Sequence, residues 1–131
     1  MKKIGLDDSE RVLNSYPFEL SGGMNQRVGI CTAMIMRPKL LLADEPTSAL
    51  DVTVQKQVVE ELLFMREEYN TAMILVTHNI GVVRMMADQV LVLQNGHVRE
   101  YGETENVLEN PQDSYTKKLM ESVLRLKKSG M

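Results

Sequence analysis

Hydrophobic and polar positions along the chain follow strand-like and helix-like patterns in turn. Two short continuous apolar runs, Leu40–Ala43 and Ala72–Val76, have the pattern of strands buried on both faces. Between them, Asp51 or Thr53 is placed to cap a long helix. The residues expected on the inner face of that helix are Val54, Val58, Leu62 and Met65, and those expected to stay in solvent are Glu60, Glu61, Glu67 and Glu68.

Local start and stop signals predict further elements around these strands. A proline follows each of the first two helices, and the Asn95-Gly96 turn between apolar runs predicts a β-hairpin. The expected helices are Ser9–Asn14, a segment from Ser21 to Arg37-Pro38 with apolar Met24, Val28, Cys31 and Ile35, Ile80–Met86, and two pieces of Thr104–Lys128 broken at Asn110-Pro111. The expected hairpin strands are Val90–Leu93 and Val98–Tyr101.

The order strand, helix, strand, helix, strand predicts a parallel sheet with right-handed crossovers. The fold class is therefore α/β, with an antiparallel hairpin at one edge of the sheet. No repeat, low-complexity tract or Pro/Gly-rich linker divides the sequence, so we treat it as one unit.

Composition narrows the possible partners. The 131 residues carry a formal net charge of −3, which offers no basic field to nucleic acid or to an acidic membrane. The single cysteine, Cys31, excludes an intramolecular disulfide and a cysteine-based metal cluster. No apolar run approaches the length of a membrane span, and no signal peptide is expected. We therefore expect a domain, or a piece of one, in the cytoplasm.

The segment Leu20-Ser21-Gly22-Gly23 opens a predicted helix. Two glycines at that place let a ligand approach the backbone, and the N–H groups and dipole of the first turn favour an anion such as phosphate. Taken alone, the segment is better explained as a Ser21 N-cap after a glycine turn.

An acidic pair and a histidine are expected at the carboxyl ends of the parallel strands, where open α/β sheets bind ligands. Asp44 can hold Mg²⁺, and the adjacent Glu45 can orient and deprotonate a water, although two acids could also simply cap the next turn. His78 follows the second strand, where a neutral imidazole could touch a γ-phosphate or the attacking water. A lone histidine there is more often a polar loop residue, but we expect these groups to converge at one sheet edge.

These segments and their order closely resemble the ATP-binding cassette ATPases from Tyr16 to about Tyr101. The segments that carry the resemblance run from Leu20 to Arg27, from Leu40 to Asp51 and from Val76 to His78. The resemblance implies that Ser21, Gly22 and Gly23, followed by Met24 and Gln26, form the signature motif, which contacts ATP held by the opposite subunit of a dimer. It makes Asp44 the Walker B residue that serves Mg²⁺, Glu45 the catalytic carboxylate and His78 the switch histidine. Asp51 ends the D-loop, Ser48 to Asp51, which crosses the dimer interface.

The tail resembles one subgroup of this family. Gly102-Glu103-Thr104 and the segment Glu109–Leu119 look like the ending of oligopeptide, dipeptide and nickel importer subunits. The implied partners are a second nucleotide-binding subunit, transmembrane permease subunits and, indirectly, an extracytoplasmic solute-binding protein, with no nucleic acid. The implied location is the inner face of the cell membrane. The implied cofactors are ATP and Mg²⁺, both expected only together with the half of the domain that carries the phosphate-binding loop.

The sequence departs from the family pattern in three places. Met24 stands where the plain signature motif has Gln, and Asn79 stands where Asp usually follows the switch histidine. None of the glycines begins a Gly-x-x-x-x-Gly-Lys-Ser/Thr loop, which cradles the β- and γ-phosphates. We therefore expect the C-terminal half of a nucleotide-binding domain, with 1–16 ending a helical subdomain, 17–101 carrying the motifs and 102–131 forming a helical tail.

Two other functions compete with a fragment of an importer ATPase. A separately encoded, non-catalytic half-domain could act as an interaction or regulatory module, and a neighbouring reading frame for the phosphate-loop half would discriminate between the two. A cassette ATPase of DNA repair shares the signature and the acidic pair. We rank it last because no sustained heptad pattern appears and the net charge is acidic.

Overall fold

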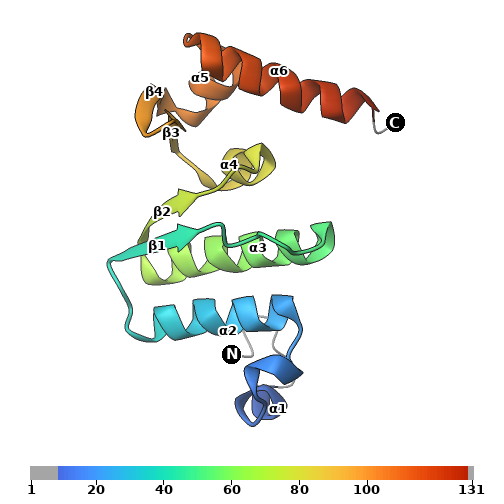
Figure 1. Cartoon of the computed structure of the whole chain (residues 1–131). Coiled ribbons are helices and arrows are strands. Elements are labelled where there is room, and N and C mark those ends of the chain that lie inside the picture. Colours follow the sequence, from blue (N-terminus) through green and yellow to red (C-terminus); the bar gives the residue numbers. More distant parts are fainter. Residues whose placement is uncertain (1–8, 130–131) are drawn as a thin grey trace. The chain divides into compact units, whose positions relative to one another are not determined.

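The computed structural model describes residues 9–129, with side chains described as far as Val123. The chain forms two compact units, Met1–Thr77 and His78–Met131 (Figure 1). No change in composition marks this boundary in the sequence. Thr77 and His78 directly follow the last residue of a strand. Treating the chain as one unit was therefore wrong.

The first unit packs α-helices against a two-stranded parallel sheet. Its elements are α1 (Ser9–Leu13), the short 3-10 helix η2 (Pro17–Glu19), α2 (Gly22–Ile35), β1 (Leu40–Asp44), α3 (Val52–Tyr69) and β2 (Ala72–Val76). Strands β1 and β2 pair in parallel with Leu40 opposite Ala72 and Asp44 opposite Val76. At the start of β2, the Thr71 hydroxyl donates to the Pro38 carbonyl at 2.9 Å. The predicted crossover from strand to helix to parallel strand is confirmed.

The core of this unit lies along α3. Val58, Leu62 and Met65 are buried as predicted, and Val59 joins them. Glu60, Glu67 and Glu68 are exposed, but Glu61 is not, so the prediction that Glu61 stays in solvent was wrong. The reason is a tertiary contact with α2 that no local pattern could indicate.

The predicted burial of both faces of the strands was also wrong. Burial alternates along β1 and β2, and Leu42 is 69% exposed. Four apolar side chains form what we call the bare sheet face, namely Leu40, Leu42, Ile74 and Val76. Figure 1 shows α3 running alongside the strands, and the described elements of this unit leave the bare face open to solvent.

The inner face of α2 differs from the predicted one by a small rotation. Cys31 is buried against Val12 of α1, with Met24 and Val28 packed beside them. Ile35, however, is 73% exposed, and Ile30 and Met34 are buried in its place. A helix that packs against partners on two sides buries a wider stripe than one apolar residue per turn defines.

The second unit contains a hairpin between helices. Its elements are α4 (Ile80–Met86), β3 (Gln89–Gln94), β4 (His97–Glu103), α5 (Thr104–Glu109) and α6 (Ser114–Ser129). The strands are antiparallel, and Asn95 and Gly96 have the positive φ angles, 51° and 78°, that the predicted turn requires. Among the described residues, β1 and β2 form one two-stranded sheet, and β3 and β4 form another. The fold class is α/β, as predicted.

Glu100 on β4 anchors the start of α6. Its carboxylate accepts hydrogen bonds from the backbone N–H groups of Gln112 and Asp113 at 2.8 and 3.2 Å. Partial desolvation alone would raise the pKa of Glu100, but these hydrogen bonds outweigh it and lower that pKa from its ordinary value.

Within the described residues, no helix is both long enough and apolar enough to span a bilayer.

Candidate functional site

The first candidate segment lies at the start of α2. Ser21 is the N-cap, and its Oγ accepts a hydrogen bond from the Met24 N–H at 3.3 Å. The N-cap interpretation of this serine is therefore confirmed. Ser21 and Gly22 are exposed, and Gln26 is half-buried.

The second glycine has a packing role that the sequence did not indicate. An added Cβ at Gly23 would lie 2.6 Å from the Cγ1 atom of Val54 on α3. An added Cβ at Gly22 would meet only the Cδ2 atom of Leu50, at an ordinary 3.9 Å. The start of α2 therefore lies directly against the start of α3, and only glycine fits at position 23.

We expect Gly23→Ala to destabilise the chain by about 1–3 kcal/mol, because the β-branched Val54 side chain is too stiff to move aside. Gly22→Ala is the matched control, and we expect it to leave stability unchanged or slightly higher, since alanine favours helix. Urea unfolding of both variants measures the difference. Equal midpoints would show that the contact between Gly23 and Val54 does not constrain the fold.

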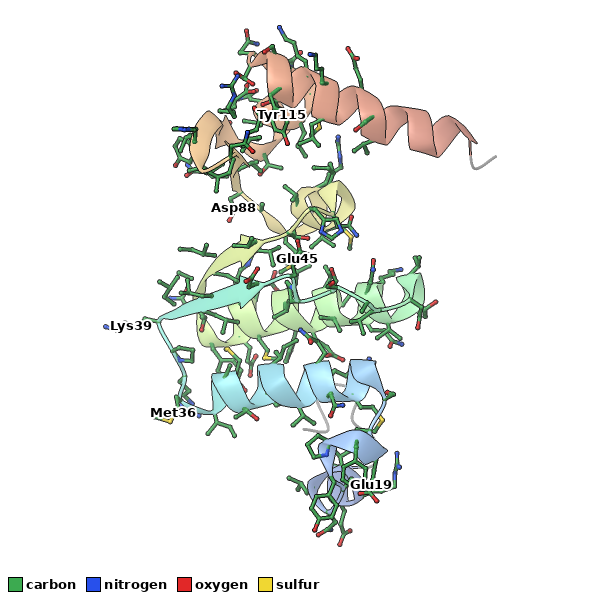
Figure 2. All side chains as sticks on the ribbon, in the orientation of Figure 1. Glu19, Met36, Lys39, Glu45, Asp88 and Tyr115 are labelled. Carbon is green, nitrogen blue, oxygen red and sulfur yellow. The ribbon has the colours of Figure 1, made fainter. Side chains whose placement is uncertain are left out.

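The acidic pair lies where β1 ends, and Figure 2 shows Glu45 at that end of the strand. Asp44 is the exposed last residue of β1, and Glu45 is half-buried. The Glu45 N–H donates to the Val76 carbonyl at 2.8 Å, which continues the ladder one residue beyond the strand. Glu45 has a φ of 45° and Ala49 a φ of 59°, the left-handed region that glycine favours. Such strain is concentrated at functional sites.

Asp51 caps α3. Its Oδ1 atom accepts from the N–H groups of Thr53 and Val54, both at 3.0 Å. Of the two predicted caps, Asp51 is therefore the one used. Because Val54 also packs against Gly23, this cap fixes the backbone on which the start of α2 rests.

His78 is exposed, and it follows β2 by two residues. The register places Val76 opposite Asp44, but the division into two units falls between Thr77 and His78. The convergence of His78 with Asp44 and Glu45 therefore stays a prediction. The neighbouring Asn79 caps α4, with its Oδ1 accepting from Gly81 N–H at 2.9 Å, so Asn performs the capping that Asp would otherwise supply.

The oxygen donors at the end of β1 fit a magnesium ion that is also held by phosphate. No group of three or more His, Cys, Asp or Glu side chains is assembled anywhere in the described part of the chain. Mg²⁺ commonly uses one or two carboxylates, several waters and substrate phosphates rather than a cage of protein ligands. Asp44 is the carboxylate predicted to hold the ion, and Glu45 beside it is predicted to act on water.

Sequence comparison matches residues 1–48 to the ABC transporter family model. Oligopeptide transport ATP-binding protein OppD of Haemophilus influenzae is 46% identical over 94% of this chain. Protein AmiE of Streptococcus pneumoniae, with the same descriptive name, is 44% identical over 96% of the chain. The chain is therefore similar to the ATP-binding proteins of the ABC transporter family. It spans 38% of the length of OppD and 36% of that of AmiE.

Two further proteins are similar to this chain. The metal-staphylopine import system ATP-binding protein CntD of Staphylococcus aureus is 43% identical over 92% of the chain, which spans 44% of CntD. The structure resembles a dimeric, post-hydrolysis state of the ATP-binding cassette MJ0796 bound to ADP and Pi. The TM-score is 0.62 and the identity 35%, over 70% of this chain and 39% of that one. The roles assigned to individual residues of this chain stay predictions.

Proposed function

We propose that this chain supplies the signature motif, Walker B carboxylates and switch histidine of the ATP-hydrolysing subunit of a peptide or nickel importer. The observation that carries the proposal is the 46% identity to an oligopeptide transport ATP-binding protein, together with an acidic pair held at the end of a parallel strand. The relatives' names, which include peptide and metal import, support the solute classes.

In this proposal each residue has one task in phosphoryl transfer, where catalysis is mostly positioning and charge neutralisation. Mg²⁺, when bound with ATP, neutralises charge on the phosphates. Asp44 holds that ion, and Glu45 orients and deprotonates the attacking water. His78 donates to the γ-phosphate region. The first-turn N–H groups of α2, at Gly22 and Gly23, face the phosphates of ATP carried by a second nucleotide-binding subunit.

The same proposal sets the partners and the location. A second nucleotide-binding subunit completes each ATP site, as the dimeric state of the solved relative suggests. Permease subunits in the membrane hold the ATPase at the inner face of the cell membrane, and an extracytoplasmic solute-binding protein acts through them. No nucleic acid is a partner.

A non-catalytic interaction module is the second candidate function. The 131 residues contain no Gly-x-x-x-x-Gly-Lys-Ser/Thr loop, and the chain spans 38% of the length of OppD. Without that loop, no nest of backbone N–H groups and no lysine holds the β- and γ-phosphates. A chain that supplies only the signature face to a partner would need no loop of its own.

We expect isothermal titration of the 131-residue chain with Mg-ATP to show no binding tighter than about millimolar. Micromolar binding would contradict the role of the missing loop. A chimera in which this chain replaces the 123 matching residues of Haemophilus OppD supplies the rest of a nucleotide-binding protein. We call it the OppD chimera. Mg-ATP hydrolysis by this chimera supports the importer ATPase, and binding without hydrolysis favours the interaction module.

A further inference from the structure

Arg27 joins α2 to α3 through two contacts. Its Nε atom lies 3.0 Å from Oε1 of Glu61, and its Nη2 donates to Oε1 of Gln57 at 2.7 Å. The Arg27 and Glu61 side chains are only 13% and 12% exposed. Arg27 lies on α2, whereas Gln57 and Glu61 both lie on α3, 30 or more positions further along the sequence, so these contacts determine how the two helices sit on each other.

The burial of this ion pair distinguishes it from the exposed ion pairs of the same chain. Lys56 and Glu60 lie on α3 at 3.8 Å, with side chains 69% and 57% exposed, and such pairs contribute little. Glu61 differs because its Oε2 is buried and receives no hydrogen bond from the described residues. Burial raises the pKa of Glu61, and Arg27 opposes that rise. Removing Arg27 alone would therefore leave a buried carboxylate without its cation.

The ion pair continues a seam that begins at the start of both helices. Gly23 and Arg27 are four residues apart on α2, and Val54, Gln57 and Glu61 follow one another at intervals of three and four on α3. Residues at these spacings share one face of a helix. The close contact between Gly23 and Val54 fixes the separation of the helices, and the Arg27 contacts one turn further on prevent α2 from rotating or sliding on α3.

We propose that Arg27 is a positioning residue, which locks α2 on α3 so that the N–H groups of Ser21–Gly23 and the Asp51 cap form one rigid surface. That this surface meets the nucleotide of a second subunit rests on the proposed function. The locking of the two helices does not depend on that function. Arg27 touches neither ATP nor the reacting atoms in this proposal and acts only through the helix that carries it.

The test separates positioning from simple stabilisation in the OppD chimera. Replacing a buried ion pair with apolar residues of similar size often leaves stability intact, because no charge remains buried. We therefore expect the double variant Arg27→Met with Glu61→Leu to keep the thermal midpoint of the parent. Its turnover should fall about 10–100-fold with a raised KM for Mg-ATP, since small misplacements near reacting groups are costly. Arg27→Lys keeps the positive charge but loses the guanidinium hydrogen bond to Gln57. We expect its turnover to lie between that of the parent and that of the double variant.

Lys56→Gln is the matched control, because it breaks an exposed ion pair on the same helix, and it should leave turnover and KM unchanged. Parent-like turnover and KM in the double variant would overturn the proposal. The proposal would also be overturned if, across all variants, turnover fell in proportion to the fall in thermal midpoint.

A second measurement does not depend on catalysis. In the 131-residue chain, the amide NMR shifts of Gly22 and Gly23 should move in the double variant and in Arg27→Lys, but not in Lys56→Gln. Unmoved shifts in folded variants overturn the proposal. If the parent chimera is inactive but the amide shifts move as expected, the proposed function is refuted. The inference that Arg27 locks α2 on α3 is then still supported.

Discussion

Glu45→Gln is expected to lower Mg-ATP turnover by the OppD chimera by about 10²–10⁴-fold, the usual contribution of a general base. Mg-ATP binding and ATP-dependent dimerisation should persist, because the amide keeps the size and the hydrogen-bonding oxygen of the carboxylate. The left-handed backbone at Glu45 makes this substitution informative. Glu and Gln share the same Cβ geometry, so the φ strain and the hydrogen bond from the Glu45 N–H to Val76 are unchanged.

The measurement is single-turnover hydrolysis alongside Mg-ATP titration of the same protein. Glu60→Gln, at an exposed position on α3, is the matched control and should behave as the parent does. Near-normal hydrolysis in Glu45→Gln would reject Glu45 as the catalytic carboxylate. Lost binding with lost hydrolysis would instead assign Glu45 to holding the nucleotide.

Leu62→Ala is expected to destabilise the 131-residue chain by about 2–5 kcal/mol, the range for emptying a fully buried leucine site. Leu62 is 0% exposed, and Val58, Val59 and Met65 on the same helix are buried almost as completely. Stiff β-branched neighbours cannot collapse into the space, which places the expected cost toward the upper part of that range.

Urea unfolding followed by far-ultraviolet circular dichroism measures this loss. Ile35→Ala is the matched control, because Ile35 lies on α2 of the same unit, outside the bare sheet face, and is 73% exposed. Its substitution should change the free energy of unfolding by no more than about 0.5 kcal/mol. Equal losses in the two variants would show that α3 is not the core of the first unit.

Elements that begin or end through local chemistry were predicted well from the sequence. The N-caps Ser21 and Asp51 start α2 and α3, and Asn95-Gly96 makes the hairpin turn. Each of these signals acts within four residues along the chain, so it can be recognised without knowing the fold. The predicted span of α4 was also correct.

The buried and exposed faces of helices and strands were predicted less well, because burial depends on which other elements pack against each face. Glu61 looks like one of several solvated acids until Arg27 approaches from another helix. Ile35 fits the apolar spacing of α2 and yet points away from both of its partners, as its exposure indicates. A continuous apolar run such as Leu40–Ala43 does not reveal whether both sides of its strand are covered.

The candidate site shows the same division. The sequence placed Asp44 and Glu45 at the end of a strand and Ser21–Gly23 at the start of a helix, and the structure agrees with these placements. The sequence indicated neither the positive φ of Glu45 nor the packing reason for Gly23. The Gly23 constraint comes from a distant partner, the Val54 side chain, and the Glu45 N–H is bonded to another distant partner, the Val76 carbonyl.

The bare sheet face also affects how any measurement on the isolated chain must be made. Anything that binds the folded form but not the unfolded form raises the apparent stability by mass action. Apolar patches such as Leu40, Leu42, Ile74 and Val76 favour self-association. The unfolding midpoint should therefore rise with protein concentration, so that variants can be ranked only at one fixed concentration.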